Sequence, residues 1–142
     1  MRPTRSMRAG LLALLAAACA APQSAAPPVC VLPSQREMVV AELYFGRAIA
    51  GRAPLSEDEW QGFAAEVIAA QFPDGFTVLD AEGGWRSPAT GALVRDPTKV
   101  LVVAVPPAQD LPTRLGAVID SYRTRFGQQS VGLVTRPACA AF

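Results

Sequence analysis

The sequence predicts an α+β domain in which two helices cover one face of a four-stranded antiparallel sheet. Three observations lead to this prediction. Short apolar runs alternate with longer stretches of helical periodicity, their order is strand, helix, strand, strand, helix, strand, and glycine or proline separates them. This βαββαβ order is typical of the ferredoxin-like fold. In that fold the strands stand side by side in the order 4-1-3-2.

The first half of the domain begins with a strand over residues 38–46. Apolar side chains alternate there with more polar ones, which is typical of a strand with one buried face. Glu42 and Tyr44 fall on the opposite face, away from the predicted helices. The sequence Ser-Glu-Asp-Glu at 56–59 forms a capping box, so a helix is predicted to begin there. Its apolar stripe runs to Phe72, where a Pro-Asp-Gly turn ends it.

The second half supplies the remaining strands and helix. Residues 75–81 and 99–105 are rich in β-branched side chains and predict the second and third strands. Two prolines follow the third strand and stop it. Asp110 can cap a second helix, whose apolar stripe extends to Phe126 before a glycine. Residues 130–135 predict the last strand.

The N-terminus has the features of an export signal. Three arginines precede the uncharged run Ala9–Ala18, whose ten residues are about half of what a membrane span needs. The run leads through three alanines into Cys19, as in bacterial lipoprotein signals. We therefore expect residues 1–18 to be a signal peptide and Cys19 to be lipidated. Cleavage after Ala20 would instead release a soluble periplasmic or secreted protein.

Three regions follow from this reading of the chain. After the signal peptide, residues 19–32 begin with the lipidated cysteine and continue as a flexible tether rich in alanine and proline. Residues 33–142 form a single α+β domain. The expected location is the membrane, with the domain facing the periplasm and the lipid on Cys19 as its membrane partner.

Charge and composition exclude several functions. Loss of three arginines with the signal leaves 10 of the 13 basic residues against 12 acidic ones, so no basic surface for nucleic acid is expected. The chain has no histidine. Serine and cysteine catalysis with a histidine base, and histidine-ligated metals, are therefore excluded. We expect no cofactor and no metal site.

The three cysteines are expected to have separate roles. The first predicted strand begins just after Cys30, and the fourth ends just before Cys139. Antiparallel pairing of these two strands brings both cysteines to the same edge of the sheet. Since export exposes the chain to oxidising conditions, we predict a disulfide between them. Cys19 then remains for the lipid.

A candidate ligand or partner surface lies on the open side of the sheet. Glu42 and Tyr44 are placed there by alternation, and Arg47 follows just past the strand end. Trp85 and Arg86, in the long connection between the second and third strands, offer an aromatic wall and a cation. The hypothesis is that these five residues line one binding surface. Structural packing and a solvated sheet face are the alternative.

Acidic residues near the second strand allow two further hypotheses. Asp80 and Glu82 are two residues apart, so they could share a face and act as a general acid/base pair. With Asp96 they could also contribute oxygen ligands to Ca²⁺, although their spacing matches no calcium loop. A solvated turn explains the same residues more simply.

Several short motifs resemble a known family. They are Glu-Leu-Tyr-Phe-Gly-Arg at 42–47, Phe-Pro-Asp-Gly-Phe-Thr at 72–77, Gly-Trp-Arg at 84–86 and Gln-Gln-Ser-Val at 128–131, together with Trp60, Phe63, Tyr122 and Phe126. In these the chain resembles the bacterial domain of unknown function 3574, a family of small exported proteins. The resemblance implies the fold and export, and it carries over no substrate or catalytic residue.

Two classes of function remain. The first is an envelope module that binds a small molecule or another protein through its open sheet, and pairing of two sheets in a homodimer is one form of this. The second is a cofactor-independent enzyme that uses carboxylate or tyrosine acid-base chemistry, by analogy with other ferredoxin-like proteins. The two differ in the surface they require. An enzyme needs a deep pocket, whereas a binding module needs an exposed sheet face.

Overall fold

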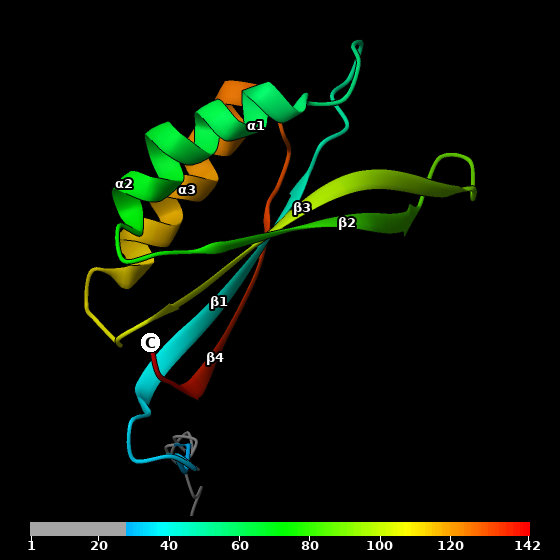
Figure 1. Ribbon diagram of the computed structural model, residues 1–142. Helices are drawn as coiled ribbons and strands as arrows, with labels where there is room; N and C mark the ends of the chain where they lie inside the picture. Colours follow the sequence, from blue (N-terminus) through cyan, green and yellow to red (C-terminus); the bar gives the residue numbers. More distant parts are fainter. Residues whose placement is uncertain (1–27) are drawn as a thin grey trace, which may run out of the picture.

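The computed structural model describes residues 28–142 (Figure 1). The predicted signal peptide, Cys19 and most of the tether lie outside the described residues. Within residues 28–142, no helix combines the length and the hydropathy that crossing a bilayer requires.

The described residues form one four-stranded antiparallel sheet and one layer of helices. In chain order the elements are β1 (Arg36–Gly46), α1 (Glu57–Phe63), η1 (Ala64–Ile68), α2 (Ala69–Gln71), β2 (Thr77–Arg86), β3 (Leu93–Val105), α3 (Leu111–Phe126) and β4 (Gly132–Ala140). The strands are hydrogen-bonded in the order β2-β3-β1-β4, which confirms the predicted 4-1-3-2 arrangement. Figure 1 shows the helices together on one side of the sheet. The fold is ferredoxin-like, as predicted.

The first helical stretch begins at the predicted capping box. The Ser56 hydroxyl accepts a hydrogen bond from the Glu59 amide at 3.2 Å, and the Glu59 carboxylate accepts one from the Ser56 amide at 2.9 Å. These two bonds satisfy amides that have no partner within the helix. Halfway along, η1 widens into a π-helix before α2 resumes the ordinary turn.

The hairpin of β2 and β3 is longer than predicted. Trp85 and Arg86 were expected in an irregular connection, but both lie in β2, where Trp85 pairs with Val94 and Arg86 with Leu93. The prediction failed because glycines at 83 and 84 and a proline at 97 disfavour a strand locally. Cross-strand pairs stabilise the extension, including an ion pair between Arg95 and Glu82.

The last strand is also longer than predicted, and it ends at Ala140 rather than at residue 135. Pro137 lies inside it, opposite Val39 of β1. Because β4 is an edge strand, a proline can remain in it at little cost in hydrogen bonding.

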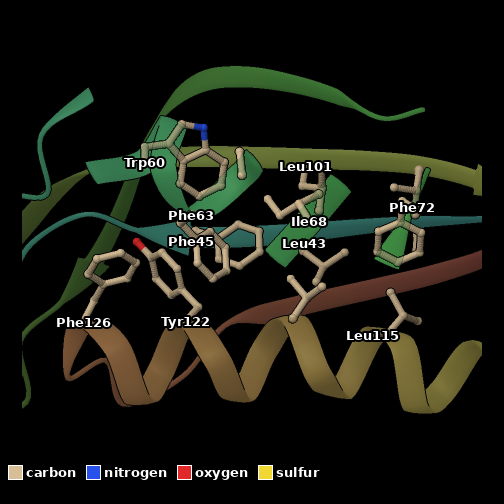
Figure 2. Close-up of a cluster of buried hydrophobic side chains, with 14 of the residues drawn as sticks. Leu43, Phe45, Trp60, Phe63, Ile68, Phe72, Leu101, Leu115, Tyr122 and Phe126 are labelled. Atoms are coloured by element: carbon tan, nitrogen blue, oxygen red, sulfur yellow. The ribbon is translucent and has the colours of Figure 1, made fainter. Parts of the chain in front are cut away.

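Aromatic side chains fill the space between the sheet and the helices (Figure 2). Phe45 of β1 meets Tyr122 of α3 with ring centroids 4.7 Å apart and Trp60 of α1 at 5.3 Å. Edge-on contacts of this kind add to the free energy of burying each ring. The Tyr122 hydroxyl donates to the carbonyl of Gly46 at 2.9 Å, so its polar atom is satisfied inside the core.

A disulfide joins Cys30 to Cys139, as predicted, with 5.4 Å between the two Cα atoms. It forms because β1 and β4 are antiparallel neighbours, and Arg36 at the start of β1 pairs with Ala140 at the end of β4. The segment before β1 is therefore fixed covalently to the end of the sheet.

Candidate functional site

Within residues 28–142, the helices lie on one face of the sheet and leave the opposite face uncovered (Figure 1). We call it the open sheet face and define it by two rows of side chains that cross all four strands. The first row is Thr77, Val102, Glu42 and Val134, and the second is Leu79, Val100, Tyr44 and Gly132. Four of these eight residues are aliphatic. Leu79 and Val134 are 53% and 48% exposed, so the face presents aliphatic surface to its surroundings.

Glu42 and Tyr44 of this face are bonded to each other and to Arg136, which lies in the adjoining row with Val40 and Ala104. The Tyr44 hydroxyl donates to the Glu42 carboxylate at 2.7 Å, and Arg136 of β4 forms an ion pair with the same carboxylate at 2.7 Å. The hydrogen bond from Tyr44, followed by that from Arg136, lowers the pKa of Glu42 below its ordinary value. The same bond to Glu42 raises the pKa of Tyr44. Together these residues leave the face without net charge.

Arg136 was not among the predicted site residues. The predicted last strand stopped at residue 135, just before Arg136. Continuing the period-two alternation of β4 by one residue would have placed Arg136 beside Glu42 and found this ion pair.

Arg47 does not join the open sheet face. β1 ends at Gly46, and the chain then turns toward the helices. The Arg47 guanidinium donates to the carbonyl of Leu55 at 2.8 Å and lies 3.7 Å from the Glu57 carboxylate. Arg47 therefore ties the β1–α1 connection to the start of the helix.

Trp85 and Arg86 lie at the far end of the β2–β3 hairpin. Trp85 is six residues beyond Leu79 along β2, which is roughly 20 Å at the rise of a strand. Arg86 donates to the carbonyl of Gly91 at 2.6 Å and so closes the hairpin loop. Of the five predicted residues, the structure brings only Glu42 and Tyr44 together.

A second polar cluster lies on the covered side of the sheet, around Lys99. Its side chain is only 3% exposed, and its ammonium group forms ion pairs with Asp80 at 2.6 Å and Glu57 at 2.7 Å. Burial by itself would lower the pKa of Lys99, but the hydrogen bonds to Asp80 and Glu57 outweigh this and raise it. The hydrogen bond from Lys99, followed by that from Gln61, lowers the pKa of Glu57. Lys99 is therefore held in its charged form.

Lys99 is the single lysine of the sequence, and it was not predicted as a site residue. The signal that could have found it is the alternation of β3. Counting back in steps of two from Val103 through Leu101 reaches Lys99, which places a charged side chain in a buried row.

The Lys99 cluster forms one end of a groove of about 530 Å³ between the first helix and the β2–β3 strands. Its lining combines charged, amide and apolar side chains. We call it the Lys99 groove and define it by Glu57, Trp60, Gln61, Ala64, Ala65, Phe76, Val78, Asp80 and Lys99.

The three acidic residues considered for acid/base or Ca²⁺ chemistry, Asp80, Glu82 and Asp96, contact different partners in the structure. Asp80 forms an ion pair with Lys99 and Glu82 forms one with Arg95, so each carboxylate has its own cationic partner. Asp96 accepts a hydrogen bond from the Ala48 amide at 2.8 Å. Among residues 28–142, no group of three acidic or cysteine side chains is arranged to hold a metal ion.

This chain is similar in sequence to one protein family and similar in fold to several solved structures. A family model described as a protein of unknown function, DUF3574, matches residues 40–142. No curated protein sequence matches the chain.

Solved structures of similar fold include a phage SAM lyase in complex with S-methyl-5'-thioadenosine. It has 14% sequence identity and a TM-score of 0.55, and the match covers 74% of this chain and 90% of that one. A phage SAM lyase in the apo state gives 13% identity and a TM-score of 0.53, with 75% and 90% covered. CutA from Synechococcus elongatus gives 11% identity and a TM-score of 0.48, with 74% and 80% covered. At these identities the first two likenesses concern the fold alone.

Proposed function

The chain belongs to this family of proteins of unknown function, and from that premise we propose that it is an exported, lipid-anchored binding module of the bacterial envelope. In this proposal Cys19 carries the lipid and the domain faces the periplasm. The open sheet face binds the partner. The observation that carries the proposal is the continuous surface across all four strands, which has exposed aliphatic side chains and no net charge.

Two features support the export part of the proposal. The first nineteen residues combine a basic flank, a short apolar run and a cysteine, as lipoprotein signals do. The disulfide between Cys30 and Cys139 is of the kind that persists in oxidising compartments. The two features are independent, because one lies in the leader and the other in the domain.

We propose that the open sheet face pairs with the same face of a second copy of this chain. The β1–β3, β1–β4 and β2–β3 ladders contain 8, 9 and 10 residue pairs. At about 3.3 Å per residue and about 4.8 Å between strands, they present roughly 430 Å² of flat area. Two copies would therefore bury about 860 Å² of flat area, and side chains that interdigitate would raise this toward the lower limit of about 1,000 Å² for a specific interface.

The charges of the face also suit pairing with itself. Because Glu42 and Arg136 neutralise each other, two copies would meet without net repulsion. In a symmetric dimer the same two residues could exchange partners, so that Glu42 of each copy meets Arg136 of the other. The polar pair would then fix the register of an otherwise apolar contact.

The alternative of a cofactor-independent enzyme has less support. The glutamates with lowered pKa values, Glu42, Glu57 and Glu59, are all held in ion pairs. Burial raises the pKa of Tyr122, but that side chain lies in the hydrophobic core. None of these groups has the free, substrate-facing position that a general acid or base requires.

Intact-mass analysis of the protein purified from membranes tests the anchor. We expect an N-terminus at Cys19 whose mass includes acyl chains. An unmodified N-terminus at Ala21 would contradict the lipid anchor and indicate soluble export.

Sedimentation equilibrium of the exported protein tests the pairing. We expect a dimer, which Val134→Lys should convert to a monomer by placing a charge in the apolar row. Leu133→Lys is the matched control, because Leu133 is similarly exposed on the same strand but faces the other way. A monomeric wild type, or equal loss of the dimer in both variants, would contradict pairing through this face.

A further inference from the structure

We propose that the Lys99 groove is a second binding site, which takes a small organic cation with an apolar body, such as an arylalkylammonium ion. The groove is on the covered side of the sheet and is separate from the open sheet face. The proposal therefore does not depend on self-pairing or on the lipid anchor.

The groove has one charged end and one apolar end. Lys99 joins Glu57 and Asp80 at the charged end through its two ion pairs. Ala65 lies eight residues after Glu57, which is about 12 Å along a helix. Phe76 lies four residues before Asp80, which is about 13 Å along a strand. The helix and the strand therefore give similar distances from the charged end of the groove to its apolar end, about 12 Å.

The apolar end is open because the helix presents only methyl groups to it. Ala64 and Ala65 are the first two residues of the π-helix η1, and both line the groove. Longer side chains at these positions would fill the space between η1 and Val78. π-Helical turns occur frequently at functional sites, because the widened turn shifts the side chains that follow it. The apolar body of the ligand would rest against Ala65, Phe76 and Val78.

The charged end favours a cation. Two carboxylates and one ammonium group line the groove, and the Arg47 guanidinium lies 3.7 Å from the Glu57 carboxylate, so the charges at this end balance. The two cations are the less exposed groups: the side chains of Lys99 and Arg47 are 3% and 18% exposed, whereas those of Glu57 and Asp80 are 53% and 77% exposed. A ligand entering from solvent therefore meets the carboxylates first. An anion that entered from solvent would approach the exposed carboxylates of Glu57 and Asp80 before it could reach Lys99, and this approach is unfavourable.

The hydrogen-bonding atoms at this end are mostly acceptors. Asp80 contacts Lys99 through Oδ1, and within residues 28–142 its Oδ2 forms no hydrogen bond. The side-chain nitrogen Nε2 of Gln61 donates to the Glu57 carboxylate at 2.9 Å. The side-chain oxygen Oε1 of Gln61 can therefore accept a hydrogen bond from a ligand. A primary ammonium group has three donors and no acceptor, so its chemistry complements this set.

Titration with 2-phenylethylammonium chloride, followed by isothermal calorimetry and by NMR shifts of the backbone amides, tests the proposal. We expect saturable binding with the largest shifts at Ala64, Ala65 and Val78. The matched anion 3-phenylpropionate has the same ring and a chain of similar length, and it should bind at least about tenfold more weakly. Equal binding of the two ions, or shifts elsewhere on the domain only, would overturn the proposal.

Three substitutions separate the groove from nonspecific charge effects. Asp80→Asn should weaken phenylethylammonium binding about tenfold or more, whereas Glu82→Gln on the same strand face should leave it unchanged, because Glu82 is outside the groove. Lys99→Met should strengthen binding, because the carboxylates lose their internal cation. Unchanged affinity in Asp80→Asn would overturn the proposal even if the Lys99→Met protein does not fold.

The binding test of the Lys99 groove and the dimerisation test of the open sheet face can fail independently of each other. A monomeric protein that binds phenylethylammonium in the groove would support this site and contradict pairing through the open sheet face. A dimer that binds no phenylethylammonium would overturn this site alone.

Discussion

Lys99 lies in β3 beside the buried aliphatic residues Leu101 and Val103, and it remains charged there because two carboxylates meet its ammonium group. The carboxylates themselves are largely in water, so they are solvated whether or not the lysine is present. The free energy of desolvation is therefore concentrated on the lysine. This asymmetry decides which substitutions the fold tolerates.

Replacing Lys99 should cost less stability than removing its partners. Lys99→Met removes the buried charge and keeps a side chain of similar length, so we expect the free energy of unfolding to change by less than about 1.5 kcal/mol. The double substitution Glu57→Gln and Asp80→Asn leaves the buried charge uncompensated and should cost about 3–5 kcal/mol. Urea unfolding of both proteins measures the difference. The reverse order would show that the ion pairs, rather than the buried charge, dominate.

Glu59 gives the protein a defined acid sensitivity. Its hydrogen bonds to Arg52 and to the Ser56 amide lower its pKa from an ordinary value of 4.5 to about 2. Because the folded-state pKa is the lower one, this stabilisation is fully present above pH 4.5 and is lost as the pH falls toward 2. We expect urea midpoints to decrease over that range, and Glu59→Gln to make the decrease shallower. An identical pH dependence in the variant would contradict the assignment to Glu59.

At the scale of the elements, the two glycines of α3 have opposite roles. Gly127 ends the helix with φ of 63°, a left-handed conformation that residues with a Cβ adopt at a cost. Gly116 is inside the helix with no atom within 4 Å of an added Cβ. One glycine is required by the backbone, whereas the other lowers helix stability.

Alanine substitutions should therefore shift stability in opposite directions. Gly127→Ala is expected to lower the free energy of unfolding by about 1 kcal/mol, because it forces a Cβ into the left-handed region. Gly116→Ala is expected to raise it by about 0.5–1 kcal/mol. Thermal unfolding measured by circular dichroism reports both shifts. A stabilising Gly127→Ala would mean that the helix can end in another conformation.

Element order and topology could be predicted from the sequence, because periodicity and capping are local. The capping box at Ser56 and the strand alternation around Leu43 are both found where they were predicted. The extended hairpin and the end of β4 could not be predicted, because Pro97 and Pro137 argue against a strand unless the neighbouring strands are known.

The candidate sites depend on which elements become neighbours, so the sequence predicted them only in part. Alternation within one strand places Glu42 and Tyr44 together, and the structure agrees. Trp85 was grouped with them as part of a long connection between the second and third strands, whereas it lies in β2 at the far end of the hairpin. The pairing of Lys99 with Glu57 joins residues from two elements that only the tertiary fold brings together.

At the scale of the whole molecule, the disulfide closes almost the entire domain. Cys30 and Cys139 are 109 positions apart in the sequence, and among residues 28–142 every helix and nearly all of the four strands lie between them. Such a bridge stabilises the fold by reducing the entropy of the unfolded chain.

Reduction of the disulfide should lower the free energy of unfolding by about 4–5 kcal/mol, according to the chain-entropy estimate for a loop of this length. Urea unfolding with and without reductant measures this change. The double variant Cys30→Ala and Cys139→Ala is the control, and it should match the reduced protein and be insensitive to reductant. A change below about 1 kcal/mol would show that the unfolded chain gains little freedom when the bridge is absent.

The position of the same bridge also determines how the domain carries mechanical tension. A pull on the chain before Pro28 enters at Cys30, and the disulfide divides it between the start of β1 and the end of β4. Without the bridge, β1 would take the whole load, and its pairs with β4 could open one after another from Arg36 inward. With the bridge, both strands move together. A domain held by its N-terminal segment can then be pulled repeatedly without its sheet unzipping from the loaded end.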